Sequence, residues 1–424
     1  MRYAIVGFGC AGFNAARAIR TEDPQGEIHV FEQTGAPPAN PMLTTYYASE
    51  AINYKAIFPF GTLEEIRVRY SLIIHSEVRV AHVRAERREL VFEDGDVASF
   101  DRILIATGAR AFVPPIDGYP SDHAFLMRTT ADAVRLKTYL DATPVKKAVV
   151  VGASMVGIKV AELLLNRGIE TTIADFAEFL FPVAAFRDVA EELEERVRSR
   201  GISFAWHKGV AGIGERSVRF SDGTELEADI VCLCIGTRAN TELLANKELV
   251  EGERVEIKRG IVVDEHMRTN IPGVYAAGDC CEGRNLLTGE TMIIGLWQNA
   301  GFQGDTAGHN MAGADRVYRG TIPHNITHFM DIYFIGIGDN RAIGETLTYG
   351  QLKDPLFVKA VQRKGDLKCV NIIGNSEVGG ILKSFFLKQL SLPVPARLPT
   401  VQRMVLMKNG LPTEFIDLLE GGLR

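Results

Sequence analysis

The sequence predicts an α/β protein with two Rossmann-like domains and a smaller α+β domain at the C-terminus. Three observations lead to this fold class. A glycine-rich turn between an apolar strand and a helix occurs twice. A longer stretch that follows each turn further along the chain is repeated without a gap, and the composition changes near residue 317. The length of 424 residues also exceeds what a single hydrophobic core normally supports.

The composition is that of an ordinary globular protein, with 46% hydrophobic and 24% charged residues. A net charge of −6 predicts no general attraction to nucleic acid or to an anionic membrane. No apolar run is long enough to span a membrane, and the first residues lead directly into a strand without a signal-peptide pattern. The six cysteines form no C-x-x-C pair, so we expect a reducing, cytoplasmic location and no metal site.

The first glycine-rich turn lies in "AIVGFGCAGFNAARAI", where Gly7, Gly9 and Gly12 match the dinucleotide-binding pattern G-x-G-x-x-G. The first glycine makes the turn, the second lets a pyrophosphate approach the backbone, and the third lets the helix pack on the strand. A strand is predicted before the turn (residues 3–6) and a helix after it. The next strand ends in Glu32, 20 residues after Gly12, where an acid can bind ribose hydroxyls.

The second turn, "VVVGASMVGIKVAELL", is an imperfect copy of the first. Gly152 and Gly157 hold the outer positions, but Ser154 replaces the middle glycine and its Cβ narrows the approach. The following strand, "IETTIAD", ends in Asp175, 18 residues after Gly157. The order of strand, turn, helix, strand and acid is therefore the same in both halves.

The repeat continues beyond the turns. Residues 92–110, "FEDGDVASFDRILIATGAR", align without a gap with residues 220–238, "FSDGTELEADIVCLCIGTR". In each copy the Asp-Gly pair predicts a hairpin turn, and the apolar run after it predicts a buried parallel strand ending near Gly108 or Gly236. The sequence thus predicts two dinucleotide-binding domains of one architecture.

These motifs, with "TNIPGVYAAGDC" at residues 269–280, identify a resemblance to the flavoprotein pyridine nucleotide–disulfide oxidoreductase superfamily. The chain is most similar to the rubredoxin reductase, ferredoxin reductase and nitrite reductase FAD-domain group, over residues 1–313. The resemblance implies an FAD-binding domain in residues 1–112 and 238–316, and an NAD-binding domain in residues 113–237. It also implies an interface domain in residues 317–424, used for dimerisation or for contact with an acceptor.

The resemblance also assigns residues to FAD. Glu32 is expected at the ribose, Val78 by the adenine and Asp279 at the ribitol, while a helix over 297–311 points its positive end at the flavin. The expected FAD-binding residues are Gly7, Gly9, Gly12, Glu32, Val78, Thr107, Gly108, Gly278, Asp279 and Trp297.

The second domain is expected to bind NAD. An acid at Asp175 accepts hydrogen bonds from the ribose 2′-hydroxyl and repels a 2′-phosphate, which favours NAD over NADP. The alternative is a capping or surface aspartate. The expected NAD-binding residues are Gly152, Ser154, Met155, Gly157, Asp175 and Gly236.

The chain departs from the disulfide-reducing members of the superfamily because no cysteine occurs between Cys10 and Cys232. The segment "NPMLTTYY" instead resembles the "RPxL" stretch of the ferredoxin and rubredoxin reductases, with Asn40 in place of arginine. We therefore expect no disulfide chemistry, and no catalytic residue is assigned. Cys10, Cys280 and Cys281 are either packed thiols or redox sensors, and Lys159 either reaches the flavin–nicotinamide junction or is solvated.

The leading hypothesis is an FAD-containing, NAD(H)-dependent oxidoreductase that exchanges electrons with an iron–sulfur protein or subunit. It includes the NAD-reducing subunit of a larger dehydrogenase, such as an aldehyde oxidoreductase, and a homodimer as forms of assembly. Two alternatives stay open: an NADH oxidase or peroxidase that uses oxygen species, and a non-catalytic flavin- or NAD-binding redox sensor.

Overall fold

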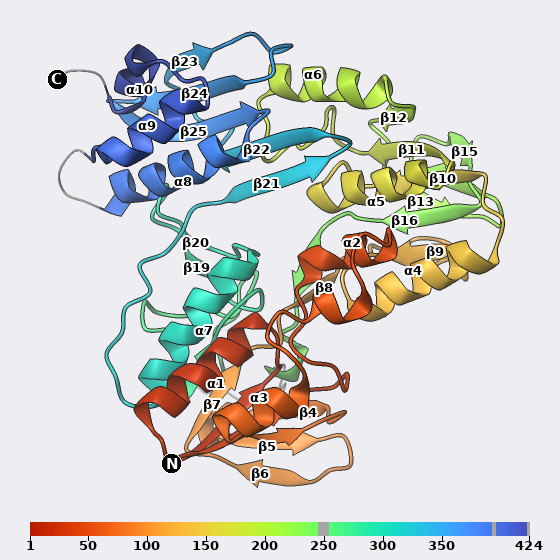
Figure 1. The fold of residues 1–424 in the computed structure, drawn as a ribbon. Coiled ribbons are helices and arrows are strands. Elements are labelled where there is room, and N and C mark those ends of the chain that lie inside the picture. The colour runs from red at the N-terminus through yellow and green to blue at the C-terminus, as the bar shows by residue number, and fades with distance from the viewer. Residues whose placement is uncertain (245–253, 392–395, 422–424) are drawn as a thin grey trace.

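The computed structural model describes residues 1–244, 254–391 and 396–421. Within these residues the chain forms two parallel five-stranded sheets and one antiparallel five-stranded sheet, each with helices packed on it (Figure 1). The predicted α/β fold class with two Rossmann-like sheets is confirmed. The predicted interface domain, residues 317–424, lies partly outside the described residues.

The first parallel sheet is built from strands of two stretches that lie far apart in the sequence. Its strands, in spatial order, are β18 (Val274–Ala276), β7 (Arg102–Ile105), β1 (Arg2–Val6), β2 (Glu27–Phe31) and β3 (Ile73–His75). All neighbouring pairs are parallel, and β1 at the centre is almost entirely buried, as expected for a strand covered on both faces.

Helices α1 (Cys10–Glu22) and α7 (Trp297–Met311) lie side by side against this sheet (Figure 1). Glycines make the close approach possible: a Cβ on Gly304 would lie 2.1 Å from the carbonyl oxygen of Ala11, and one on Gly308 would lie 2.4 Å from that of Ala15. The predicted helix over residues 297–311 is confirmed at both ends, with Gly313 at φ +100° just beyond it.

The second parallel sheet is built from a contiguous stretch of chain. Its strands, in spatial order, are β12 (Ile202–Trp206), β11 (Glu170–Asp175), β10 (Lys147–Val151), β16 (Ile230–Leu233) and β9 (Ala124–Leu126). Helices α4 (Thr130–Ala142), α5 (Met155–Asn166) and α6 (Arg187–Arg198) accompany it. The predicted Asp-Gly hairpins join β5 (Glu89–Phe92) to β6 (Val97–Ser99), and β14 (Ser217–Phe220) to β15 (Glu225–Glu227).

The two sheets are connected by a two-stranded antiparallel ribbon of β8 (Ala109–Ala111) and β17 (Thr237–Ala239). The chain leaves the first sheet through β8 and returns to it through β17. The limits predicted for the three domains fall near this ribbon and near residue 317, and they stay predictions.

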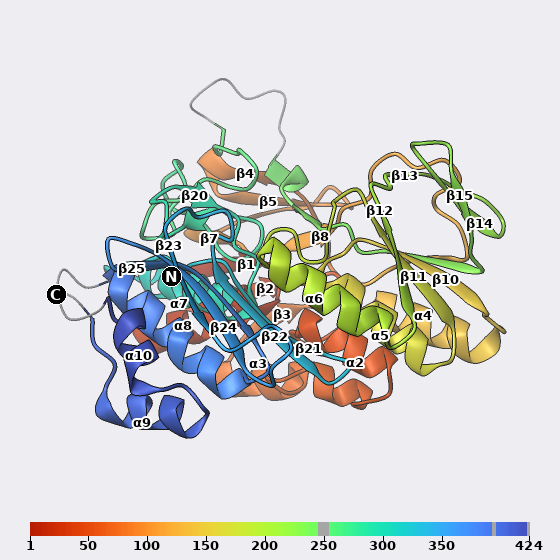
Figure 2. The same cartoon turned by 90° about the horizontal axis from the view of Figure 1, so that it is seen from above.

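The third sheet is antiparallel. Its strands, in spatial order, are β21 (His324–Phe329), β22 (Ile332–Gly338), β25 (Asp366–Ile373), β24 (Phe357–Arg363) and β23 (Glu345–Tyr349). Helices α8 (Ser376–Ser391), α9 (Thr400–Lys408) and α10 (Thr413–Leu419) belong to the same part of the chain. Seen from above, the sheet lies beside α6 (Figure 2), and Phe181 stacks on Phe334 with 5.2 Å between ring centres.

Candidate nucleotide-binding site

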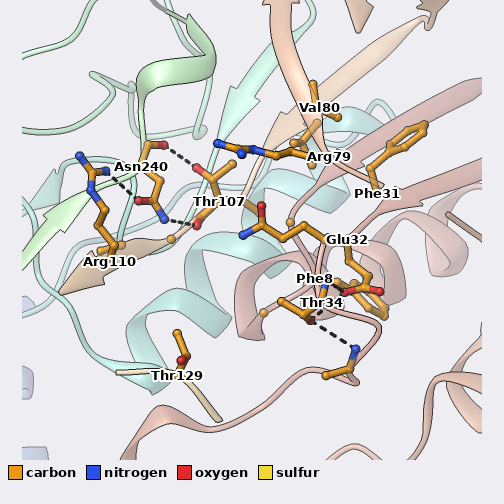
Figure 3. Close-up of a pocket in the computed structure, with 18 of the residues that line it drawn as sticks. Phe8, Phe31, Glu32, Thr34, Arg79, Val80, Thr107, Arg110, Thr129 and Asn240 are labelled. Atoms are coloured by element: carbon orange, nitrogen blue, oxygen red, sulfur yellow. Dashed lines mark hydrogen bonds between the residues drawn. The ribbon is translucent and has the colours of Figure 1, made fainter. Parts of the chain in front are cut away.

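A large cleft of about 880 Å³ opens at the carboxyl ends of β1 and β2 (Figure 3). Parallel sheets bind ligands at this edge, because the loops that follow the strands gather there. Six of the ten residues predicted for FAD line the cleft, namely Gly7, Gly9, Glu32, Val78, Thr107 and Gly108. Its volume lies within the range of cofactor pockets.

The first glycine-rich turn has the geometry that its sequence predicts. A Cβ on Gly7, which has φ +99°, would lie 2.4 Å from the carbonyl oxygen of Ala106, and one on Gly12 would lie 2.2 Å from that of Gly7. Gly9, by contrast, has open space where a Cβ would be. Gly7 and Gly12 therefore allow close packing of the backbone, and Gly9 leaves room for a phosphate to approach it.

Glu32 lies at the end of β2, is 5% exposed and accepts hydrogen bonds from its own chain. Ser76 Oγ donates at 2.7 Å, and the backbone amide of Thr34 donates at 2.8 Å. Burial alone would raise the pKa of this carboxyl, but the donors from Ser76 and Thr34 outweigh it and hold the pKa below its usual range. The Ser76 hydroxyl can rotate away, so a ribose hydroxyl would replace Ser76 at Glu32 while the backbone donor stays in place.

Gly278, Asp279 and Trp297 are not among the residues that line the cleft. The amide of Gly278 donates to Gln303 Oε1 at 2.8 Å, which ties the turn after β18 to α7. Asp279 forms an ion pair of 2.7 Å with Arg128, whose side chain does line the cleft. Arg128 was not found from the sequence, although it lies two residues after the end of the strand β9.

A second group missed from the sequence surrounds Thr107. Figure 3 shows Asn240 between Thr107 and Arg110: Asn240 Nδ2 donates to the carbonyl of Thr107 at 2.9 Å, and Arg110 donates to Asn240 Oδ1 at 3.0 Å. Thr107 Oγ1 in turn donates to the carbonyl of Asn240 at 2.7 Å. Asn240 therefore fixes the loop after β7, although it lies 133 residues further along the chain.

The start of α7 is uncapped, because no side chain bonds to its first amides within the described residues. Such amides, together with the helix dipole, favour a negatively charged group. Trp297 begins the helix and stacks on Phe60 at 5.7 Å, and Phe60 stacks on Phe13 of α1 at 3.9 Å. The residues present fit FAD: an open glycine turn, a buried carboxylate, a cation facing the cleft and an uncapped helix start.

In the second glycine-rich turn, Ser154 has a structural role at the start of α5. Its hydroxyl donates to the carbonyl of Cys234 at 2.9 Å and accepts from the amide of Gly157 at 3.0 Å, so Ser154 is the N-cap of α5. The outer glycines pack as in the first turn: a Cβ on Gly157 would lie 1.9 Å from the carbonyl oxygen of Gly152. Met155 follows as the first residue of α5 and is partly buried.

Asp175 ends β11 and receives two backbone amides. Ala153 donates to Oδ2 at 2.6 Å and Ala177 donates to Oδ1 at 2.7 Å. The aspartate thus caps the turn of the glycine motif, and each oxygen keeps a lone pair for a ribose hydroxyl. Gly236, at φ +105°, follows the neighbouring strand β16 with open space at its Cβ position.

Lys159 is neither solvated nor unpaired, since its side chain is 14% exposed and forms an ion pair with Glu162. Its ammonium also donates to the carbonyl of His328 at 2.9 Å and lies 4.7 Å from the ring centre of Tyr46. Glu162 accepts from the amide of Met330 at 2.6 Å. The pair joins α5 to the turn between β21 and β22 and to α2 (Thr44–Ala48), a cross-link that local sequence patterns do not indicate.

All six cysteines are buried and unbridged. Burial raises the pKa of Cys10 to about 12 and also raises the pKa of Cys280 and of Cys281, so these thiols stay protonated at neutral pH. Cys232, on β16, and Cys234, which directly follows it, are core residues.

Comparison with known proteins identifies the family of a chain with these two glycine-rich turns. The family model described as pyridine nucleotide-disulphide oxidoreductase matches residues 1–304. The chain belongs to the pyridine nucleotide-disulphide oxidoreductase family. As a member of it, the protein is an FAD-dependent NAD(H) oxidoreductase, and its cofactors are FAD and NAD(H).

Two relatives of this pyridine nucleotide-disulphide oxidoreductase are a dehydrogenase subunit and an oxidase. The NADH-dependent phenylglyoxylate dehydrogenase subunit epsilon of Aromatoleum evansii is 28% identical over 408 residues, which cover 92% of each chain. The NADH oxidase of Methanocaldococcus jannaschii is 30% identical over 345 residues, which cover 80% of this chain and 76% of the relative.

Among solved structures, the covalent complex of putidaredoxin reductase with putidaredoxin contains a chain of the same fold. The TM-score is 0.82 at 21% identity, and the match covers 97% of this chain and 99% of that one. This likeness confirms the architecture of a two-domain FAD and NAD reductase. Among the residues that the structure describes, no helix of this oxidoreductase combines the length and the apolar character needed to cross a membrane.

Proposed function

We propose that this NAD(H)-dependent flavin oxidoreductase exchanges electrons between NAD(H) and an iron–sulfur protein or subunit. In this proposal the chain is the NAD-linked subunit of a larger dehydrogenase or the reductase of a separate electron carrier. The relative from Aromatoleum evansii supports the first form, because its name describes a subunit of an NADH-dependent dehydrogenase and the similarity extends over most of both chains.

The observation that carries the proposal is the state of the cysteines. No cysteine lies between Cys10 and Cys232, and all six thiols are buried with no disulfide. When bound, FAD takes two electrons from NADH and can release them singly, which suits one-electron iron–sulfur acceptors. Because the chain has no accessible thiol pair to receive the electrons, we infer that the acceptor is a separate protein.

The proposed FAD site is the 880 Å³ cleft together with the start of α7. Gly9 admits the pyrophosphate, Glu32 accepts from the adenosine ribose, and Asp279 accepts from the ribitol. Arg128 also lines the cleft and pairs with Asp279, so it would hold that carboxylate in place. The remaining residues proposed for FAD are Gly7, Gly12, Val78, Thr107, Gly108, Gly278 and Trp297.

The proposed NAD site is the turn between β10 and α5. Asp175 accepts from the 2′-hydroxyl of the adenosine ribose while its charge excludes a 2′-phosphate. Met155 lies at the start of α5, where its flexible side chain can yield to the nicotinamide. Gly152, Ser154, Gly157 and Gly236 complete the proposed site. We also propose the domain limits 1–112 with 238–316, 113–237 and 317–424.

A second candidate is an NADH oxidase, since the relative from Methanocaldococcus jannaschii has that name. The two functions differ in where the electrons go, so one purification separates them. The protein is isolated from its native host with its cofactor bound, and iron, acid-labile sulfide and FAD are measured in the same fractions. Oxygen uptake with NADH alone is then compared with the anaerobic reduction of the co-purifying iron–sulfur protein by NADH.

We expect iron and sulfide to elute with the flavin, and we expect the iron–sulfur protein to be reduced faster than oxygen is consumed. An iron-free protein whose oxygen uptake accounts for all NADH oxidised would overturn the proposal in favour of the oxidase.

A further inference from the structure

The ribbon that connects the two parallel sheets carries two arginines directly opposite each other. In the antiparallel register of β8 and β17, Arg110 pairs with Arg238. Directly opposed residues share one face of a ribbon, and like charges in this position destabilise it. A negatively charged group on that face would therefore stabilise the ribbon.

Only one of the two charges is balanced within the described part of the chain. Arg110 forms an ion pair of 2.5 Å with Glu242 and a hydrogen bond with Asn240. Arg238 is exposed and has neither a hydrogen bond nor an ion pair with any residue that the structure describes. One positive charge on this face thus has no counter-charge among the residues that the structure describes.

Both arginines line a cavity of about 390 Å³. Apolar and aromatic residues, with Phe112, Tyr119 and Leu126 among them, form part of its other walls, and Phe112 is 39% exposed. Arg128 and Thr129 also line it. Asp132 also lines the cavity, but its Oδ2 accepts from the backbone amides of Arg128 and Thr129 at the start of α4. The Asp132 carboxylate therefore caps the start of α4 and forms no ion pair with Arg238.

The cavity adjoins the large cleft but differs from both proposed cofactor sites in most of its lining. It shares Arg110, Arg128 and Thr129 with the large cleft, and its remaining lining residues belong to it alone. No residue of the second glycine motif lines it. A ligand here would sit against the ribbon through which the chain passes between the two sheets.

We propose that this cavity binds a nucleoside monophosphate. Arg110 and Arg238 would hold the phosphate in a charge-assisted contact, and Phe112 and Tyr119 would pack against the base. The volume suits a ligand of this size and is larger than an inorganic anion requires. The apolar walls favour a ligand with a flat aromatic body over a bare anion.

The test measures the binding of AMP by isothermal titration calorimetry. The protein carries FAD and is saturated with NAD+, so that both proposed cofactor sites are filled. We expect one AMP per chain. Arg238→Gln should weaken AMP roughly tenfold or more, because it removes a charged donor to the phosphate, and should leave the weaker binding of adenosine unchanged.

Phe112→Ala should weaken AMP and adenosine alike, since both contain the base. Arg67→Gln is the matched control, because Arg67 is an exposed arginine of α3 (Leu63–Tyr70) that is paired with Glu64 far from the ribbon. Its AMP affinity should equal that of the wild type. FAD content and circular dichroism establish that each variant is folded.

Three results would overturn the proposal. One is no heat of AMP binding at millimolar concentration. Another is AMP binding that Arg238→Gln and Phe112→Ala leave unchanged. The third is inorganic phosphate binding as tightly as AMP, which would mean that the base makes no contact.

Discussion

The guanidinium of Arg128 and the carboxylate of Asp279 meet at 2.7 Å, although 151 residues separate them. Arg128 follows β9 of the second parallel sheet, and Asp279 follows β18 of the first. The side chains are 23% and 16% exposed, so the pair is largely shielded from water. It therefore links the two nucleotide-binding parts of the chain beside the large cleft.

Arg128→Gln should weaken the binding of FAD by about 1.5–3 kcal/mol, the usual contribution of a charged hydrogen-bonding group. The physical reason is that the substitution removes a cation that lines the cleft and breaks the ion pair with Asp279, the residue proposed for the ribitol. Fluorescence titration of the apoprotein with FAD measures the effect. Arg17→Gln is the control, because Arg17 forms an ion pair of 3.2 Å with Asp305 that does not line the cleft. Equal losses in the two variants would contradict the assignment.

Asp175→Ala should weaken NADH more than NADPH, with a loss for NADH of about 1–3 kcal/mol from the buried hydrogen bond. The alanine also leaves the amides of Ala153 and Ala177 without their acceptor. Asp175→Asn separates these effects in part, because it removes the charge and keeps one acceptor oxygen for one of the two amides. Steady-state KM values for both nucleotides test this, with Asp96→Ala on an exposed turn as the control. A wild type that prefers NADPH would refute the reading of the second turn.

The buried cysteines predict how many electrons the protein stores. Anaerobic titration should bleach the visible absorption of the holoenzyme with about one equivalent of NADH, because a two-electron cofactor is the only store. No thiolate charge-transfer band should develop, since burial keeps the thiols protonated. Serine at Cys10, Cys280 and Cys281 should leave electron transfer to a dye nearly unchanged. A requirement for two equivalents would instead identify a thiol redox centre.

The Lys159–Glu162 pair should contribute to stability as a unit. Lys159→Met leaves a largely buried carboxylate without its cation, and we expect it to cost about 2–3 kcal/mol of the free energy of unfolding. The double variant Lys159→Met with Glu162→Gln should recover part of this loss, because no unpaired charge remains. Urea unfolding is measured for the wild type, for Lys159→Met and Glu162→Gln alone, and for the double variant. Strict additivity of the single effects would show that the two side chains do not interact.

His324 makes stability depend on pH in a defined direction. Burial, reinforced by Lys383, lowers the pKa of His324 from 6.5 to about 4. Between these values the unfolded chain takes up a proton and the folded chain does not, so stability falls as the pH drops from 6.5 towards 4. Urea unfolding at pH 7 and pH 5 should show a smaller loss for His324→Asn than for the wild type. His82→Asn, at an exposed position, should match the wild type.

The sequence was most informative where chemistry is local. Helix α7 was predicted to the residue, because an uninterrupted helical pattern ends at Gly313, where φ is positive. Both glycine turns were recognised because strand, glycine and helix follow one another within about a dozen residues. The environment of Glu32 was not foreseen, since its donor Ser76 follows the neighbouring strand β3 and lies 44 positions away in the sequence.

Contacts between distant segments could not be predicted from one sequence. Arg128, Asn240 and Lys159 each bond to residues more than 130 positions away, and nothing in their local sequence indicates the partner. The structure brings them together because the chain leaves the first sheet, builds the second and returns. These side chains join the parts of the fold, which is a property of topology and not of local pattern.

The packing of α7 against α1 also has a consequence for synthesis. Helix α1 needs Gly304 and Gly308 as its neighbours, and the sheet beneath it is incomplete until β18 has been made. The second parallel sheet comes from one contiguous stretch and can form earlier on the ribosome. Helix α1, which ends at Glu22, therefore cannot pack in its final place until α7, which ends at Met311, has been synthesised. We expect nascent chains to become competent for flavin binding only in a single late step.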